Sequence, residues 1–427
     1  MNTIEIIYQH FQKAYKVSTD SRKIEKDAVF FALKGENFDA NDFAMQVAEE
    51  GKASLVVADR KDLPKHEHIL IVDDTLKALQ DLAAYHRSQS KAIVLSITGT
   101  NGKTTTKELV SAVLAKKYHI IHTQGNLNNH IGVPLTLLSI KPETEIAVVE
   151  MGANHPGEID FLCKIADPDY GLITNIGKAH LEGFGSFEGV IKTKTELYRH
   201  IKRHGKAVFV NQGNPLLWEQ SEGQERISYG RHCAAFCPVA PGACNPYLSV
   251  IWRKHLIQTH LVGSYNFENV AAAIGVGQYF SVNEDAIIEA LEAYTPTNSR
   301  SQVIETEKNR IIMDAYNANP TSMRAALINF ANICGEQHLL ILGDMRELGT
   351  ASEEEHRNIL GLMKELGFKE ALLVGQNFRT YNENASWKTF EKVGDLCQYL
   401  ESHPISEKTI LVKGSNSIQL GKVLPLL

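Results

Sequence analysis

The segment SITGTNGKTTTKELVSAVLAKK, residues 96–117, decides how the middle of this chain folds. It begins inside a β-branched run, KAIVLSIT (91–98), which predicts a strand. The loop GTNGKT (99–104) follows at once, and apolar residues then recur on one side of a predicted helix at Leu109, Val110, Val113 and Leu114. A strand, a glycine-containing loop and a helix in this order predict a phosphate-binding loop.

The residue types of this loop explain why it would bind phosphate. Gly99 and Gly102 let successive backbone N–H groups point into one cavity, and the N-terminus of the helix adds partial positive charge. We expect Lys103 to reach the β- and γ-phosphates of a nucleotide and the Thr104 hydroxyl to lie near a Mg²⁺ ion. Ile97 stands where the strict pattern has a glycine. The alternative is an ordinary strand-to-helix turn with a surface lysine, and the flanking strand and helix favour the phosphate site over it.

Strand-like and helix-like segments alternate along most of the chain, which predicts an α/β protein with largely parallel sheets. A break near residues 88–91 and the turn-rich segment YTPTNSR (294–300) predict domains at 1–88, 89–300 and 301–427. The last of these is expected to be a second, smaller doubly wound domain, because it carries the apolar runs RIIMDAY (310–316), HLLILGDM (338–345), EALLVGQ (370–376) and TILVKGS (409–415).

The overall composition excludes several classes of protein. Of 427 residues, 43% are hydrophobic and 22% are charged, which rules out collagen-like, coiled-coil and largely disordered chains. The net charge is −6, so we expect no binding to nucleic acid through bulk electrostatics. No apolar run approaches the ~18 residues of a membrane span, and MNTIEIIYQHF (1–11) lacks the features of a signal peptide. Six cysteines in so long a chain are not a disulfide framework, so we expect a cytoplasmic protein.

Two stretches after the loop carry side chains that could hold a metal ion. IAVVEMGANHPGEID (146–160) predicts a strand that ends at Glu150, and ligands bind at strand ends in open α/β sheets. A surface ion pair explains this glutamate equally well. A glycine-rich loop carries His180, and the helix beyond it carries Lys192 and Lys194. Taken alone, such a histidine is more often structural, and such lysines more often lie on a solvated face.

Two other clusters carry weaker signals. Asn126, Asn128 and Asn129 precede a predicted helix, and asparagine-rich segments are usually turns. Cys233, Cys237 and Cys244 lie close together, but their spacings lack the paired C-x₂-C of zinc sites, so free thiols are the better interpretation.

Taken in order, the motifs resemble those of the Mur ligase family over nearly the whole chain. They are GTNGKTT (99–105), GNLNNHIGVPLTLL (125–138), EMGANHPGEI (150–159), GKAHLEGFGSFEGV (177–190), NFENVAAA (266–273), DAYNANPTSMRAAL (314–327), LGDMRELG (342–349) and VKGSNS (412–417). These enzymes build the peptidoglycan stem peptide by ATP-driven amide formation. The pair DAYNANP and GDMRELG looks most like the branch that adds D-alanyl-D-alanine, and the DNPR-type motif of the branch that adds the third residue is not found.

The resemblance implies a fold and a set of site residues. The implied fold is α/β with three domains: a small α/β N-terminal domain, a central P-loop ATPase domain with a mainly parallel sheet, and a Rossmann-like C-terminal domain. The implied catalytic residues are Lys103, Lys194 and His180. The implied ATP-binding residues are Gly99, Thr100, Asn101, Gly102, Lys103, Thr104, Thr105, Asn266, Asn269, Arg300 and Asp314. The implied metal-site residues are Thr104, Glu150, His180 and Lys194, the last as an N-carboxylated lysine, or carbamate, whose negative charge suits a cation.

The N-terminal block resembles the module that holds the UDP end of the family's substrate, on the segments STDSRKI (18–24) and VFFALKGENFDANDF (29–43). The implied substrate-binding residues are Ser21, Arg22, Asn128, Tyr316, Asn317 and Asn319. A guanidinium suits a pyrophosphate, which favours Arg22. This chain departs from the family pattern at Ala40-Asn41, which replaces Gly-His, and at Asn416, which replaces a frequent arginine.

The resemblance implies a ligase that uses ATP and Mg²⁺ to join D-Ala-D-Ala to UDP-N-acetylmuramoyl-tripeptide through an acyl phosphate, and we expect it to act as a monomer. Another Mur-type or folylpolyglutamate-type ligase with a different acceptor is the nearest alternative. A P-loop kinase or NTPase would explain the loop and Glu150, but neither the aspartate of the third block nor Lys194. A nucleotide-binding subunit without catalytic activity would not need Lys103, Glu150 and His180 together.

Overall fold

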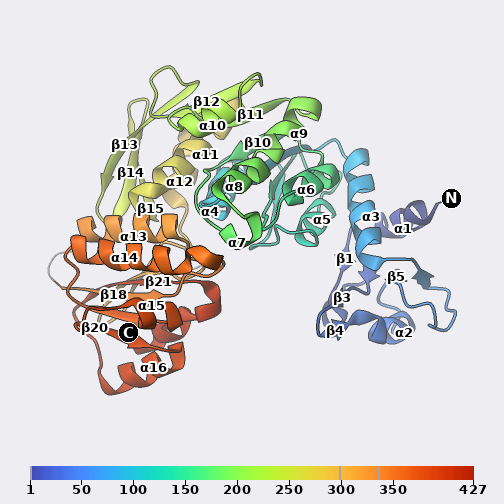
Figure 1. Ribbon diagram of the computed structural model, residues 1–427. Coiled ribbons are helices and arrows are strands. Elements are labelled where there is room, and N and C mark those ends of the chain that lie inside the picture. Colours follow the sequence, from blue (N-terminus) through green and yellow to red (C-terminus); the bar gives the residue numbers. More distant parts are fainter. Residues whose placement is uncertain (1, 298–299, 334–336) are drawn as a thin grey trace.

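The computed structural model of the chain describes residues 2–297, 300–333 and 337–427. Part of the predicted hinge at 294–300 lies outside these ranges, as does Cys334. The predicted three-domain α/β fold is confirmed, with a separate sheet in each domain. In Figure 1 the N-terminal domain (blue) and the C-terminal domain (orange to red) lie apart from each other, each against the central domain. None of the described helices is long and apolar enough to cross a membrane.

The N-terminal domain is a parallel four-stranded sheet with helices against it, in the strand order β1-β2-β5-β6. Its strands are β1 (Val17–Ser18), β2 (Val29–Phe31), β5 (Leu55–Ala58) and β6 (Ile69–Ile71), with a small hairpin of β3 (Lys34–Gly35) and β4 (Phe38–Asp39). Its helices are α1 (Thr3–Phe11), α2 (Ala44–Glu49) and α3 (Thr75–Gln89). Helix α3 also packs on the central domain, so one continuous apolar core joins the two domains.

The central domain is built on a nine-stranded sheet of order β15-β14-β13-β12-β11-β10-β7-β9-β8. In this spatial order, the seven neighbouring strands β13, β12, β11, β10, β7, β9 and β8 are parallel. Strands β14 and β15 extend the sheet in antiparallel pairing. The strands are β7 (Ile93–Thr98), β8 (Ile120–His122), β9 (Ile146–Glu150), β10 (Tyr170–Ile173), β11 (Ala207–Asn211), β12 (Arg226–Gly230), β13 (Cys237–Cys244), β14 (Tyr247–Trp252) and β15 (His255–Val262). The helices are α4 (Lys103–Leu114), α5 (Gly132–Leu137), α6 (Glu158–Ala166), α7 (Leu181–Phe184), α8 (Phe187–Lys194), α9 (Glu196–His204), α10 (Pro215–Gln220), α11 (Phe267–Tyr279) and α12 (Glu284–Ala293).

Strand β7 lies inside this sheet and is buried on both faces, which explains why its residues other than Ser96 are β-branched or apolar. Val94 packs into the core under α3, α5 and α6, whereas Leu95 and Ile97 pack on the opposite side, under α4 and α11. The strand ends at Thr98, and the chain must turn sharply to enter α4 at Lys103. The loop between them therefore lies at the carboxyl edge of a parallel sheet, where ligands bind in α/β folds.

The C-terminal domain has a six-stranded sheet of order β16-β17-β21-β18-β19-β20. Only β16 runs antiparallel to its neighbour among these described strands. The strands are β16 (Gln302–Glu305), β17 (Arg310–Asp314), β18 (His338–Gly343), β19 (Ala371–Val374), β20 (Trp387–Phe390) and β21 (Thr409–Lys413), and the helices are α13 (Pro320–Ile333), α14 (Ser352–Glu365), α15 (Gln376–Tyr381) and α16 (Val393–Ser402). The carboxyl ends of β17 and β21 and the start of α13 face the central domain's loop.

Candidate active site

The loop after β7 has the backbone of a phosphate cradle. Gly99 has φ of +143° and Gly102 has φ of +78°, values that residues with a Cβ rarely adopt. A Cβ on Gly99 would overlap the Thr174 hydroxyl, and a Cβ on Gly102 would overlap the Asn269 side chain. Both glycines are therefore required by conformation and by space, as the sequence pattern indicated.

Gly102→Ala tests this geometry. We expect the free energy of unfolding to fall by about 1–3 kcal/mol, because the methyl group adds both strain at positive φ and a clash with Asn269. Gly394→Ala is the matched control: it lies in helix α16 with no heavy atom near its added Cβ, so it should leave stability equal or slightly higher. Thermal unfolding measures both, and equal melting temperatures for Gly102→Ala and wild type would show that the loop is built differently.

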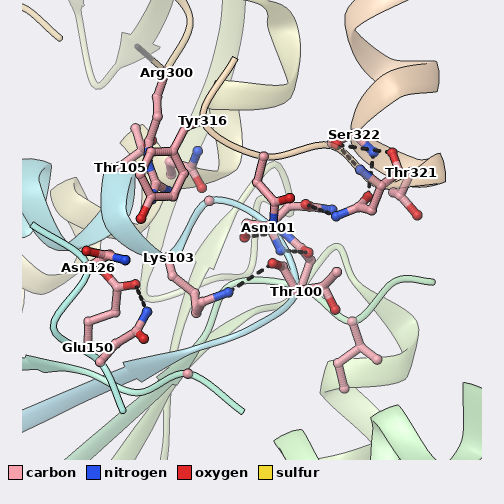
Figure 2. Close-up of a pocket in the computed structure, with 18 of the residues that line it drawn as sticks. Thr100, Asn101, Lys103, Thr105, Asn126, Glu150, Arg300, Tyr316, Thr321 and Ser322 are labelled. Atoms are coloured by element: carbon pink, nitrogen blue, oxygen red, sulfur yellow. Dashed lines mark hydrogen bonds between the residues drawn. The ribbon is translucent and has the colours of Figure 1, made fainter. Parts of the chain in front are cut away.

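Lys103, at the first turn of α4, folds back over its own loop. Its ammonium donates to the carbonyl of Gly99 at 2.8 Å and to that of Thr100 at 3.0 Å, and Figure 2 shows the side chain turned toward Thr100. Burial is the main cause that lowers the pKa of Lys103 to about 8; the charge of Glu150 opposes this shift and that of Arg300 adds to it. The ammonium is thus held at the loop and partly desolvated. A bound phosphate would offset the free energy that this desolvation costs.

Glu150 ends strand β9 as predicted, and its carboxylate is fully buried beside the loop. One oxygen accepts from the Thr104 hydroxyl at 2.8 Å, and the other accepts from the Asn128 amide at 2.7 Å. A carboxylate and a hydroxyl held together are the hard oxygen donors that Mg²⁺ prefers. The donor set therefore fits a magnesium ion, with Thr104 and Glu150 as the residues that would hold it.

Lys194, at the end of α8, is almost completely buried beside this wall. Its ammonium lies 3.4 Å from the carbonyl of Ala153, which lines the cavity, and 5.4 Å from the ring centre of Phe184. Burial holds the pKa of Lys194 well below its usual value, the charge of Lys103 adds to this effect, and Glu158 and Glu196 oppose it. A lowered pKa increases the share of neutral amine, which carbamate formation requires because the free electron pair must attack CO₂.

His180 stands at the start of α7 in a left-handed backbone conformation, with φ of +52°. Its ring forms an ion pair with Glu347 of the C-terminal domain, and this contact lowers the pKa of Glu347. The histidine lines the same cavity as Glu150. The structure therefore brings this predicted metal residue to the site, but in contact with the other domain.

Asn266 and Asn269 form a buried pair at the start of α11. The Asn269 amide donates to the Asn266 carbonyl oxygen at 2.8 Å, and its own oxygen accepts from the Thr106 hydroxyl at 3.0 Å. Both residues line the cavity, and the Asn269 side chain lies next to Gly102. Their position beside the loop agrees with the nucleotide-side role that the resemblance implies.

The C-terminal domain supplies the facing wall. The guanidinium of Arg300 lies over the ring of Tyr316, 3.8 Å from its centre (Figure 2). Asp314, at the end of β17, accepts from the ammonium of Lys413 at 2.6 Å, and the same ammonium donates to the carbonyl of Asn317 at 3.3 Å. Lys413 is 2% exposed. These two cations and the carboxylate face the loop across the cavity.

The predicted residues meet in one cavity of about 1120 Å³ between the central and C-terminal domains. Its lining includes Thr100, Asn101, Gly102, Lys103, Thr105, Asn128, Glu150, His180, Asn266, Asn269, Arg300, Asp314, Tyr316, Asn317 and Asn319. Thr104 and Lys194 lie directly behind this wall, through their contacts with Glu150 and Ala153. A volume of this size suits a nucleotide together with part of a second ligand.

Ser21 and Arg22 are not brought to this cavity. They lie in the N-terminal domain, where the exposed Arg22 forms a two-pronged ion pair with Asp20, at 2.9 Å for each bond. The departure at Asn41 is structural: this side chain is fully buried and bonds to Asp39 and Asp59. Asn416, the other departure, is exposed.

Several residues that hold the site were not identified from the sequence. Lys413 pairs with Asp314, Glu347 pairs with His180, and Asn175 accepts from the Asn101 backbone at 3.0 Å. Lys107, fully buried, donates to the carbonyls of Thr123 and Gly125 and so fixes the loop that carries Asn128. Lys413 ends an apolar strand at the carboxyl edge of its sheet, which is the signal that identified Glu150.

The cysteine cluster has no metal-site geometry. Cys237 is buried in the core of the sheet, Cys233 is exposed, and Cys244 contacts Asn329. Within residues 2–297, 300–333 and 337–427, no three His, Cys, Asp or Glu side chains converge as a metal-binding group. The described cysteines are free thiols, as expected.

Comparison with known proteins agrees with this arrangement. Three family models match in chain order: "Mur ligase family, catalytic domain" over residues 13–87, "Mur ligase middle domain" over 97–277 and "Mur ligase, glutamate ligase domain" over 299–416. The UDP-N-acetylmuramoyl-tripeptide–D-alanyl-D-alanine ligase of Bacillus subtilis (strain 168) is 34% identical over 423 residues, covering 96% of this chain and 92% of the relative.

Two solved structures are similar over nearly the whole chain. One structure of MurF from Acinetobacter baumannii has a TM-score of 0.86 and 30% identity, covering 98% of this chain and 97% of that one. MurF ligase from Thermotoga maritima, solved in complex with ADP, has a TM-score of 0.84 at 24% identity, covering 96% of both chains, and shows the shared fold.

Proposed function

Because the chain belongs to the Mur ligase family, we propose that it joins D-alanyl-D-alanine to UDP-N-acetylmuramoyl-tripeptide in an ATP-dependent reaction of peptidoglycan precursor synthesis. The relative from Bacillus subtilis bears the name of this activity and aligns over 96% of the chain. The observation that carries the proposal is the phosphate loop whose Thr104 meets the buried Glu150 at a cavity shared by two domains. A kinase, an NTPase or an inactive nucleotide-binding subunit would account for the phosphate loop but not for a cavity shared by two domains.

We propose the following roles for the residues around a bound ATP. The N–H groups of residues 99–105 and the start of α4 would bind the phosphates, with Lys103 as the mobile cation. Asn266 and Asn269 would lie on the nucleoside side, Arg300 would approach from the domain boundary, and Asp314 would approach from the C-terminal domain. Mg²⁺ held by Thr104 and Glu150, with His180 and a carbamate on Lys194 close by, would neutralise phosphate charge.

Amide formation from a free carboxylate in water needs activation. In the proposed route the γ-phosphoryl group passes to the C-terminal carboxylate of the tripeptide, and the amine of D-Ala-D-Ala attacks the resulting acyl phosphate as phosphate leaves. Two anions must approach each other in the first step, so the chain has to supply positive charge. Lys103 and Arg300 lie on facing walls and offset this repulsion. The wall contributed by the C-terminal domain also excludes water, which would otherwise hydrolyse the acyl phosphate.

The remaining features of the proposal concern the rest of the chain. We place the domain boundaries at 1–88, 89–300 and 301–427, with the first domain holding the UDP end of the substrate through Ser21 and Arg22. Arg22 is already oriented by Asp20, and its exposure leaves it accessible to a pyrophosphate. Asn128, Tyr316 and Asn317 would contact the peptide substrates in the cavity. We infer a cytoplasmic protein, since the proposed substrates are cytoplasmic precursors, and we propose that it acts as a monomer.

A reconstituted reaction tests the function. Purified protein is incubated with ATP, Mg²⁺, UDP-N-acetylmuramoyl-tripeptide and D-Ala-D-Ala, and the pentapeptide product is detected by mass spectrometry. We expect ADP release to require both the acidic acceptor and the amine. ADP release that is independent of the amine would indicate a kinase or an NTPase, and a product formed only with another acceptor would indicate a different ligase.

The pKa of Lys103 predicts how nucleotide binding depends on pH. This pKa is about 8 in the free protein, and a bound polyphosphate favours the charged form and raises it. Below pH 8 the lysine is already protonated, so affinity should change little. Above pH 8 binding must take up a proton, so Kd should rise by up to about tenfold per pH unit until the pKa of the complex is reached. Titration of a non-hydrolysable ATP analogue between pH 7.5 and 9.5 measures this dependence, and Lys103→Met should remove it.

A further inference from the structure

Asn319 joins the C-terminal domain to the phosphate loop. Its side-chain amide donates to the side-chain oxygen of Asn101 at 2.7 Å, and Figure 2 shows the loop residue directed toward the start of α13. The two residues are 218 positions apart in sequence and lie on different domains. Asn319 is 7% exposed, so this bond is largely shielded from water.

The orientation of the Asn319 amide is fixed by the helix that it starts. Its oxygen accepts from the backbone N–H of Ser322 at 2.9 Å, and its own backbone N–H donates to the Ser322 hydroxyl at 3.1 Å. This is the hydrogen bonding of a helix N-cap. Because the oxygen is used by the cap, the NH₂ group is the one that faces Asn101, and it can only donate there.

Asn101 is in turn bound tightly within the central domain. Its N–H donates to the Asn175 side chain at 3.0 Å, and its carbonyl accepts from the Thr174 hydroxyl at 2.6 Å and from the Asn175 amide at 2.9 Å. It lies between Gly99 and Gly102, so its position sets the direction of the neighbouring N–H groups. A hydrogen bond to the Asn101 side chain therefore also influences the geometry of the phosphate loop.

We propose that Asn319 is a positioning residue: when the C-terminal domain lies against the central domain, its amide bonds to Asn101 and fixes the phosphate loop in the geometry needed for phosphoryl transfer. This inference rests on the proposed function and deepens it. The bond can form only when the two domains are together, so it links the arrival of Asp314 to the shape of the cradle. It should act on the chemical step more than on initial ATP binding.

Other contacts between these domains allow this role to be separated from general domain contact. Lys178 forms an ion pair of 3.0 Å with Glu355, and neither residue touches the phosphate loop in the described structure. The Lys178 side chain is 54% exposed, whereas the Glu355 side chain is 8% exposed, so the control replaces Lys178 with glutamine, whose amide can still donate to the buried carboxylate. Loss of this pair should weaken the domain contact without altering Asn101.

The test uses Asn319→Ser in the full-length protein. Serine is as good an N-cap as asparagine but is too short to reach Asn101. We expect kcat for ligation to fall about tenfold while KM for ATP and the melting temperature change little, since the change removes one hydrogen bond made only in the closed arrangement. Lys178→Gln is the control for domain contact, and Ser322→Ala is the control for the cap. The first should leave kcat within about twofold, and the second should lower the melting temperature more than kcat.

A double-mutant cycle with Asn101→Ala decides the matter. Asn101→Ala cannot disturb the cap of α13, and it should also lower kcat about tenfold. In that background Asn319→Ser should cost less than twofold more, because the bond is already absent. Full additivity, or a loss of kcat that follows the melting temperature, would overturn the inference. Absence of ligation by the wild-type protein would instead refute the proposed function.

Discussion

Replacing Lys103 with alanine is expected to lower kcat for ligation by at least ~10³-fold and to leave the protein folded. Lys103 is the one cation of the phosphate loop, and in the proposed reaction it stabilises charge on the transferring phosphoryl group. Its hydrogen-bond partners in the described structure are the carbonyls of Gly99 and Thr100, and the buried Glu150 keeps its hydrogen bonds from Thr104 and Asn128 when the lysine is removed. Burial disfavours the charge of Lys103, so the melting temperature should stay equal or rise slightly.

The assay for this variant is pentapeptide formation, read beside a thermal melt. Lys116→Ala is a suitable control, since Lys116 follows the far end of α4 and pairs with Glu289 at the surface. It should retain wild-type activity. Ligation by Lys103→Ala at a rate close to wild type, with a normal melt, would mean that the phosphates bind elsewhere.

Lys194→Ala is expected to lower kcat by ~10²-fold or more, and added short carboxylic acids should restore part of the activity. The neutral amine of Lys194 can attack CO₂, forming an N–C bond and releasing a proton, which leaves a carboxylate where the sequence has a lysine. A small acid such as formate or acetate can enter the space left by alanine and supply an equivalent negative group. Unmodified and charged, this buried lysine would destabilise the fold below its unfolded pKa, so the variant should be no less stable than wild type.

Lys192→Ala is the matched control for Lys194→Ala. Lys192 lies two residues earlier on α8 and is exposed, so its removal should leave ligation unchanged. Intact-protein mass spectrometry at neutral pH provides an independent readout of the carbamate. Equal activity of Lys194→Ala and wild type would remove the carbamate from the mechanism, and a large loss that no carboxylic acid relieves would assign Lys194 a structural role.

In the C-terminal domain, the sequence predicted the buried strands and missed the two edge strands. A run such as HLLILG (338–343) is apolar along its length because both faces are covered. The strands β16 and β20 were not predicted. They form the two edges of the C-terminal sheet, and their sequences QVIE (302–305) and WKTF (387–390) are only partly buried. The conformation of an edge strand depends on the neighbour that it pairs with, so the local sequence predicts it poorly.

The same distinction holds for the site. Gly99, Gly102 and Lys103 could be identified from the sequence because their roles depend on adjacent residues and a flanking strand and helix. The partners of those residues could not be identified. Asn101 contacts Asn319, and His180 contacts Glu347, because the carboxyl edges of two separate sheets lie together. The spacing of these residues in the sequence does not predict the contacts.

The return of Lys103 to the carbonyls of Gly99 and Thr100 has a consequence for turnover. An enzyme that binds a polyphosphate tightly must also release the product nucleotide. A buried ammonium left without a hydrogen-bond partner would oppose that release. Here the carbonyls of Gly99 and Thr100 can accept hydrogen bonds from the Lys103 ammonium when the nucleotide leaves. We therefore expect product dissociation to be assisted by the cradle itself, so that tight capture and rapid exchange are reconciled in a single side chain.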